Sequence, residues 1–244
     1  MKLYGKNPVL ERLSVNPRSI KVIYLNEKND TAAVGEIARR YGTRCISLGE
    51  KEFFARSEGC NTQGVIADIA EFSYAELEDF LELSDAQKPV FIALSNITDP
   101  QNLGSILRSA ACFGDFALIL PKHRSASINE TVLRVACGGE NYVPVVQETN
   151  LVAALQRLKK AGCWIAGSVV EQGEDVTGFS FPFPLCVVIG AEDKGIRQGL
   201  LAHLDFKVTL PMPGRALSLN AAVAAAVLCY EIIRQKNAKD KVAK

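Results

Sequence analysis

The chain has 244 residues, of which 48% are hydrophobic and 23% charged, and its formal net charge is +1. This composition is typical of a globular protein with enough apolar residues for one large core or two smaller ones. The seven cysteines are an odd number and include no C-x-x-C pair, which argues against a disulfide framework or a zinc ribbon. We therefore expect no metal site.

Neither a signal peptide nor a membrane-spanning helix is expected. Lys2, Lys6 and Glu11 interrupt the first apolar stretch. The apolar run over 221–228 is far too short to cross a bilayer. These features predict a cytoplasmic protein that has no contact with a membrane.

The small net charge is unevenly distributed along the chain. Residues 1–70 contain 11 basic and 8 acidic side chains, residues 71–88 contain 1 and 6, and residues 89–244 contain 16 and 13. Two mildly basic blocks therefore flank an acidic connector, so either block can carry a basic patch for nucleic acid. An evenly solvated surface accounts equally well for the charge alone.

Residues 18–70 alternate short apolar runs with amphipathic stretches. The pattern predicts strands over 21–25, 44–47 and 65–70, and helices over 31–41 and 50–56. Ser73 and Glu76 then form a capping-box signature, followed by a helical face of Leu77, Phe80 and Leu81. We expect a small α/β module over 1–70, joined by an acidic linker or helix over 71–88 to a second domain over 89–244.

The second domain shows a longer and more regular alternation. Strands are predicted over 90–94, 116–120, 143–146, 164–168, 185–190 and 207–210, and helices over 103–113, 130–137, 151–161, 196–202 and 219–235. Continuously apolar strands that alternate with helices indicate a parallel sheet covered on both faces. The charged residues 237–244 are expected to form a frayed tail.

The first candidate motif is LSNITDPQNLGSILRSA, over 94–110, where a buried strand leads through a polar loop into a helix. Ligands of open parallel sheets bind beyond the carboxyl ends of strands. The spacing lets Asn102 cap the helix while Arg108 points back toward the strand ends. Spacing alone favours a simpler interpretation, in which Asn102 is only a cap and Arg108 only a surface residue.

Two further segments follow the fifth and sixth strands. VVIGAEDKGIR, over 187–197, has glycines that permit close approach to a ligand, but it matches no phosphate-binding loop. LPMPGRALSLNAAVAAA, over 210–226, turns at Gly214 and two prolines before a helix that Ser218 can cap, with Asn220 in the first turn. The small residues of this helix suit close packing in a core or against a partner helix.

In this order, the three segments resemble the SpoU (TrmH-like) family of RNA 2′-O-ribose methyltransferases. The first matches N-x-x-D-P-x-N-x-G-x-x-x-R-x-A, the second G-x-E-x-x-G, and the third P-M-x-G followed by S-L-N. The matching residues are Asn96, Asp99, Pro100, Asn102, Gly104, Arg108, Ala110, Gly190, Glu192, Gly195, Pro211, Met212, Gly214, Ser218, Leu219 and Asn220.

The resemblance extends over nearly the whole chain. Residues 121–146 look like the subgroup that methylates a guanosine ribose in large-subunit ribosomal RNA, and 4–13 look like the start of its ribosomal-protein-like RNA-binding domain. Asp193, Lys194 and 215–217 depart from the usual pattern. These departures bear on substrate choice rather than on the reaction.

The resemblance implies an α/β fold with a C-terminal trefoil knot, a rare exception among protein folds. It also implies S-adenosylmethionine as the cofactor and a homodimer formed through the C-terminal domain. The residues implied to hold the cofactor are Ile189, Gly190, Leu210, Met212 and Leu219.

The resemblance also implies roles in catalysis. Arg108 corresponds to the family's catalytic arginine, and because guanidinium keeps its proton, we expect it to grip a phosphate and polarise the 2′-hydroxyl. Asn102, Ser218 and Asn220 are expected to position groups by hydrogen bonds, and Glu192 to brace Arg108 or its loop. The general base stays unassigned. Transfer RNA as the substrate, and a catalytically silent RNA-binding protein on the same fold, remain open alternatives.

Overall fold

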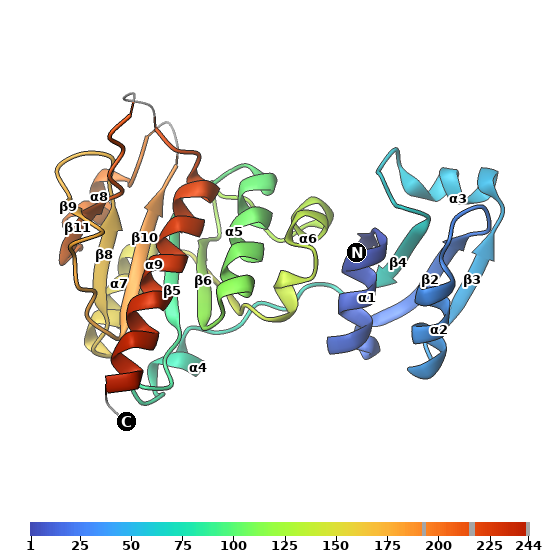
Figure 1. Cartoon of the computed structure of the whole chain (residues 1–244), viewed down its shortest axis with the longest axis horizontal. Coiled ribbons are helices and arrows are strands. Elements are labelled where there is room, and N and C mark those ends of the chain that lie inside the picture. The colour runs from blue at the N-terminus through green and yellow to red at the C-terminus, as the bar shows by residue number, and fades with distance from the viewer. Residues whose placement is uncertain (192–193, 215–217, 243–244) are drawn as a thin grey trace.

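The computed structural model describes residues 1–191, 194–214 and 218–242. The chain forms two β-sheets that lie side by side in an elongated molecule, joined where helices α1 and α6 meet (Figure 1). Among the residues in these ranges, no helix is both long and apolar enough to cross a membrane.

The smaller sheet has four strands in the order β1-β4-β2-β3. Only the β2–β3 pair is parallel. The elements are β1 (Lys2–Tyr4), α1 (Lys6–Val15), η1 (Pro17–Ser19), β2 (Ile20–Asn26), α2 (Ala32–Arg40), β3 (Cys45–Leu48), α3 (Glu50–Ser57) and β4 (Val65–Ile69). The strands and helices expected between residues 21 and 70 are confirmed, whereas β1 and α1 were not predicted.

The larger sheet has seven strands in the order β7-β6-β5-β10-β8-β11-β9, and all its pairings are parallel. The strands are β5 (Val90–Ser95), β6 (Phe116–Pro121), β7 (Val145–Glu148), β8 (Trp164–Ser168), β9 (Glu174–Asp175), β10 (Leu185–Gly190) and β11 (Phe206–Thr209). The chain builds outward from β5 to β7 and then continues on the other side, so the strand order switches beside β5. Such a switch creates a crevice at the carboxyl ends of the strands.

Helices cover both faces of this sheet, as the alternation predicted. Alternate residues of β5 face opposite ways: Val90 and Ile92 join one core, and Phe91 and Ala93 join the other. The helices of the first face are α5 (Pro100–Phe113), α6 (Glu130–Ala136) and α9 (Ala221–Val242). Those of the second are α4 (Glu78–Leu81), α7 (Leu151–Lys160) and α8 (Gln198–Leu201). Figure 1 shows α5 and α9 side by side in front of the sheet.

Two sequence predictions about helix ends are wrong. Ser73 does not cap a helix, because Ala75 pairs with Val146 at the edge of the sheet and α4 has only four residues. Backbone pairing with the open edge of β7 therefore prevails over the local capping signature. At the other end, α9 continues to Val242 instead of fraying after Gln235, and Lys239 anchors it by donating to the Phe181 carbonyl at 2.6 Å.

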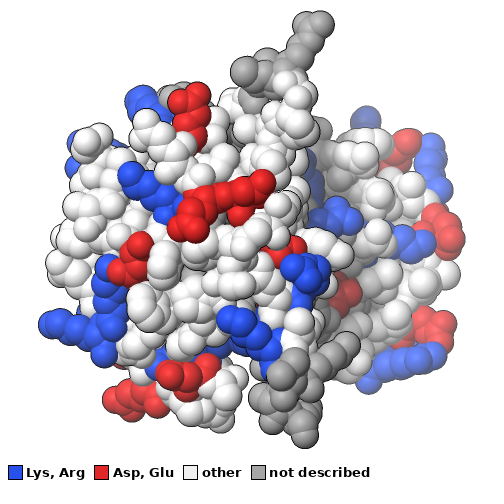
Figure 2. Space-filling view, turned by 60° about the vertical axis from the view of Figure 1, so that its left-hand side comes forward, with Lys and Arg blue, Asp and Glu red and all other residues white. Residues whose placement is uncertain are grey.

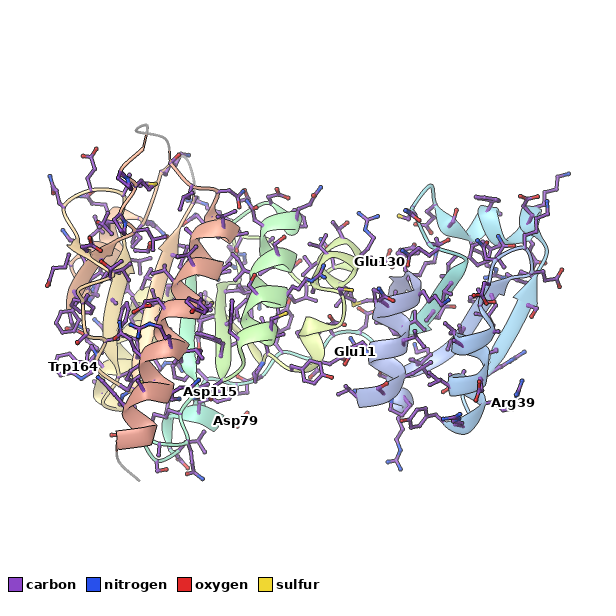
Figure 3. All side chains as sticks on the ribbon, in the orientation of Figure 1. Glu11, Arg39, Asp79, Asp115, Glu130 and Trp164 are labelled. Carbon is purple, nitrogen blue, oxygen red and sulfur yellow. The ribbon has the colours of Figure 1, made fainter. Side chains whose placement is uncertain are left out.

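The junction between the two sheets contains a buried ion pair. The Arg12 guanidinium of α1 donates to the Glu140 carboxylate at 2.9 Å, and their side chains are only 10% and 0% exposed. Glu140 belongs to η2 (Gly139–Asn141), which packs against α5. Burial raises the pKa of Glu140, while the Arg12 charge opposes that rise. Glu11 and Glu130 also lie at this junction (Figure 3).

We expect Arg12→Ala to lower the free energy of unfolding by about 3 kcal/mol, because it leaves a buried carboxylate without its partner. Arg12→Met combined with Glu140→Leu should recover most of that loss, since apolar residues of similar volume can replace a buried pair. Urea denaturation measures both. The control is Arg40→Ala, whose exposed pair with Glu36 should contribute less than about 1 kcal/mol. Equal losses for Arg12→Ala and Arg40→Ala would contradict a stabilising junction.

Candidate functional site

A cavity of about 360 Å³ lies at the carboxyl ends of β8, β10 and β11. Its walls are mostly apolar and come from three segments that are distant in the sequence. The five residues that the resemblance implied for cofactor binding all line it: Ile189, Gly190, Leu210, Met212 and Leu219. Ser218 lies at the same cavity.

The wall at β10 requires a glycine. A Cβ atom on Gly190 would stand 2.1 Å from the carbonyl carbon of Gly195 and 2.3 Å from the backbone nitrogen of Ile196. The intervening turn closes as the Gly195 N–H donates to the Ala191 carbonyl at 2.8 Å, with Gly195 in the left-handed region at a φ of +60°. Two glycines therefore let the chain fold back onto the end of its own strand.

The helices beside the cavity begin differently from the sequence prediction. Asp99 caps α5, because its carboxylate accepts from the Gln101 N–H at 2.8 Å, so the expected cap by Asn102 is wrong. Asn220 caps α9 by accepting from the N–H groups of Ala222 at 2.9 Å and Val223 at 3.3 Å, so the expected cap by Ser218 is wrong as well. Each cap is the residue directly before the first helical position.

A hydrogen bond joins the two helix starts. The Asn220 side-chain amide donates to the Asn102 side-chain oxygen at 3.0 Å. Asn220 thereby uses its oxygen for the cap of α9 and its nitrogen for Asn102. The first and third motifs are thus held together at the rim of the cavity, which Leu219 and Ala221 line.

Arg108 lies apart from this cluster. It follows Asn102 by six residues, or about 9 Å along the axis of α5. Its side chain is exposed and makes no hydrogen bond or ion pair with any other residue that the structure describes. It is not among the described residues that line the cavity, so the expectation that it points back to the strand ends stays a prediction. Glu192 and Asp193 lie outside the described residues.

The structure contains a second cavity that the sequence did not predict. It has a volume of about 1020 Å³, lies beyond the carboxyl ends of β5, β6 and β7, and includes Asn96, Arg124 and Arg197 in its lining. In the sequence, only the positions of Asn96 and Arg124 shortly after the ends of β5 and β6 indicated such a site. In the described part of the chain, no group of three or more His, Cys, Asp and Glu side chains could hold a metal ion.

Two family models match the chain. Residues 89–230 match the SpoU rRNA Methylase family, and residues 2–75 match the RNA 2′-O ribose methyltransferase substrate binding domain. The two matches cover the larger and the smaller sheet in turn.

Curated relatives match over nearly their full length. The chain is 35% identical over 246 residues to the 23S rRNA (guanosine-2′-O-)-methyltransferase RlmB of Pseudomonas syringae, covering 98% of both chains. It is 34% identical over 238 residues to YacO of Bacillus subtilis, a protein named for the TrmH family of tRNA/rRNA methyltransferases, covering 96% of this chain and 95% of that one.

Solved structures share the fold. The SpoU methyltransferase AviRb from Streptomyces viridochromogenes, in complex with the cofactor AdoMet, has a TM-score of 0.79 at 24% identity, covering 98% of this chain and 91% of that one. The family match spans more than half of the chain and the relatives match both sheets. The chain therefore belongs to the SpoU rRNA methylase family of RNA 2′-O-ribose methyltransferases.

Proposed function

We propose that this chain transfers a methyl group from S-adenosylmethionine to the ribose 2′-hydroxyl of a guanosine in large-subunit ribosomal RNA. The observation that carries this proposal is the convergence of the second and third motifs on one cavity, with Asn102 of the first motif bonded to Asn220 at its rim. The similarity to the guanosine enzyme over 98% of both chains supports the choice of nucleoside.

The cofactor fits the first cavity. Its volume of about 360 Å³ lies in the range of roughly 300–1,000 Å³ of small-molecule sites. Ile189, Leu210 and Leu219 offer an apolar slot for the adenine ring, and the backbone beside Gly190 and Met212 offers hydrogen-bonding groups for its edge. The close return of the chain at Gly190 is the kind of cradle that a side chain would fill. The family's knot would hold these segments together.

The remaining chemistry belongs to the residues at the rim. S-adenosylmethionine supplies an activated methyl group for an in-line displacement, so the chain has to orient the ribose and manage the hydroxyl proton. Asn102, Ser218 and Asn220 orient the ribose by hydrogen bonds. Arg108, which keeps its proton, grips the adjacent phosphate and polarises the 2′-oxygen. Glu192 braces Arg108 or the motif loop, and the general base is unassigned.

The two sheets divide the work. Residues 1–70 form the domain that captures RNA, residues 71–88 connect the sheets, and residues 89–244 form the methyltransferase domain. On the face that Figure 2 presents, Lys and Arg are interspersed with Asp and Glu. The place of action is the cytoplasm, where the RNA substrate is found.

Methylation of isolated RNA pools tests the choice of substrate. The purified protein should convert guanosine to 2′-O-methylguanosine in unmodified 23S ribosomal RNA and leave transfer RNA unchanged, as digestion to nucleosides and mass spectrometry would report. Methylated ribose in transfer RNA alone would favour the second candidate, for which the name of the Bacillus relative is the observation. Binding of RNA without any methylation would favour a silent assembly protein.

The chain is also proposed to act as a homodimer through α9. Three exposed apolar side chains, Val223 at 48%, Val227 at 43% and Tyr230 at 57%, follow one another at helical spacing. Leu219, 38% exposed, extends the same stripe to the rim of the cavity. Such a stripe on an otherwise packed helix suits the matching face of a second copy.

Val223→Asp combined with Val227→Asp should convert the dimer to a monomer, because each dimer would bury four added carboxylates in an apolar interface. Sedimentation velocity at tens of micromolar measures the change. Val15→Asp, at a similarly exposed valine that ends α1, should leave the dimer intact. A monomeric wild-type chain, or a dimer unaffected by the double substitution, would remove α9 as the interface.

A further inference from the structure

We infer that the second cavity is a binding site for the nucleotide next to the methylated one in the RNA strand, held through its phosphate by Arg124 and Arg197. This inference rests on the proposed function. The juxtaposition that carries it is a large polar cavity at the switch point of the sheet, lined by two arginines from separate segments, Arg124 after β6 and Arg197 after β10.

The cavity lies directly beside the cofactor cavity. Gly195 and Ile196 line the first cavity, while the next two residues, Arg197 and Gln198, line the second. Asn96, which follows β5 and belongs to the first motif, lines the second cavity. A nucleotide bound there is therefore one step along the strand from a ribose that faces the cofactor.

Size and polarity indicate a nucleotide rather than a lone ion. The volume of about 1020 Å³ is at the upper end of small-molecule sites. The side chains of His123, Asn96 and Gln198 offer donors and acceptors for the edge of a base or a ribose hydroxyl. The larger volume suits a segment of a strand that continues in both directions.

The charge of the cavity is positive. Arg124 and Arg197 are exposed, and the guanidinium group of neither makes a hydrogen bond or ion pair with another residue in the described part of the chain. No Asp or Glu is among the lining residues that the structure describes. The nearby carboxylate of Glu148, at the end of β7, is paired with Arg157. Two available guanidinium groups therefore face a site from which carboxylates are absent, which favours a phosphate.

The backbone that carries both arginines is fixed. Arg124 itself has a left-handed φ of +58°, which is uncommon for a long side chain and marks a position determined by its surroundings. Two hydrogen bonds to the Ile97 carbonyl hold its loop, from the Ser125 hydroxyl at 3.0 Å and the Ala126 N–H at 2.8 Å. The Arg197 N–H donates to the Ser95 hydroxyl at 3.2 Å. Because the backbone is already held, only the two side chains have to be ordered when a phosphate binds.

The test measures binding of a 23S ribosomal RNA fragment to full-length variants at several salt concentrations. Arg124→Ala and Arg197→Ala should each raise the Kd about tenfold and lower the slope of log Kd against log salt by about 0.7, the value for one phosphate contact with a single strand. Arg124→Lys should keep the slope, because its charge remains. The Kd for S-adenosylmethionine should stay unchanged in all of them. Lys160→Ala, an exposed cation at the far end of α7, is the matched control with no expected effect.

Wild-type affinity and wild-type salt slopes in both alanine variants, in a protein that methylates ribosomal RNA, would overturn the inference alone. Failure of the wild-type protein to methylate ribosomal RNA would overturn the proposed function instead. Competition with guanosine 5′-monophosphate tests whether the cavity binds a free nucleotide or a segment of an RNA strand. At millimolar concentration the monophosphate should displace the RNA fragment poorly. Tight binding of the monophosphate that Arg124→Ala abolishes, with RNA affinity retained, would assign the cavity to a free nucleotide and contradict the strand.

Discussion

Arg108→Ala is expected to lower the single-turnover rate of methyl transfer about 100- to 1,000-fold. A preorganised charge at a transition state contributes roughly 3–4 kcal/mol, and no other cation is assigned to the 2′-oxygen in the proposed mechanism. The rate of Arg108→Lys should lie between those of the wild-type protein and Arg108→Ala, because the charge remains and the fork geometry is lost. The Kd for S-adenosylmethionine should not change, because Arg108 is absent from the lining of the first cavity.

The rate is measured at saturating RNA with a cognate 23S fragment, so that weaker RNA binding does not obscure the chemical step. Arg39→Ala is the control, because Arg39 is exposed on α2, far from α5 (Figure 3). A near-normal rate for Arg108→Ala would refute the role carried over from the family. A Lys variant as slow as the Ala variant would replace the charge account by one that depends on guanidinium geometry.

Gly190→Ala is expected to weaken the binding of S-adenosylmethionine about 100-fold or more. The added Cβ would stand 2.1 Å from the carbonyl carbon of Gly195, so the backbone that forms the cavity wall has to move. Calorimetry gives the affinity, and thermal unfolding shows whether the fold survives. Gly178→Ala is the control, because its Cβ would have no neighbour closer than 3.9 Å.

If Gly190→Ala unfolds the protein, a milder variant keeps the prediction testable. Leu219→Ala shortens a side chain that is 38% exposed and lines the cavity, so it should weaken cofactor binding several-fold without affecting folding. Unchanged affinity in a folded Gly190→Ala protein would place the cofactor elsewhere.

The layers of the larger domain could be predicted from the sequence because its strands are continuously apolar. Each run from Val90 to Ser95, from Phe116 to Pro121 and from Leu185 to Gly190 is buried on both faces of the sheet, and the amphipathic stretches between them form helices. Local periodicity alone determines such elements. It does not determine the strand order, and the insertion of β10 between β5 and β8 was not foreseen.

Competing interactions explain the errors at the ends of elements. Ser73 carried a capping signature, but Ala75 pairs with Val146 across 71 positions of sequence. Asn102 looked like a helix cap, but Asp99 before Pro100 starts the helix earlier and leaves Asn102 to bond with Asn220. A single sequence contains no sign of such long-range partners.

The candidate site depended on the resemblance more than on local pattern. Ile189, Leu210 and Leu219 are ordinary apolar residues on three separate segments, and no periodicity marks them as neighbours. The lining of the second cavity was found neither by the resemblance nor by local pattern. Arg124 and Arg197 lie in two separate segments, 121–146 and 187–197, and only the folded sheet brings them to one site.

Ribose methylation mapped across cellular RNA tests the central claim most directly. Cells that lack this protein should lose 2′-O-methylation at one guanosine of large-subunit ribosomal RNA. The wild-type chain should restore this methylation, whereas the Arg108→Ala variant should not. All other methylated riboses should remain. An unchanged methylation map in cells that lack the protein, or a loss confined to transfer RNA, would contradict the account.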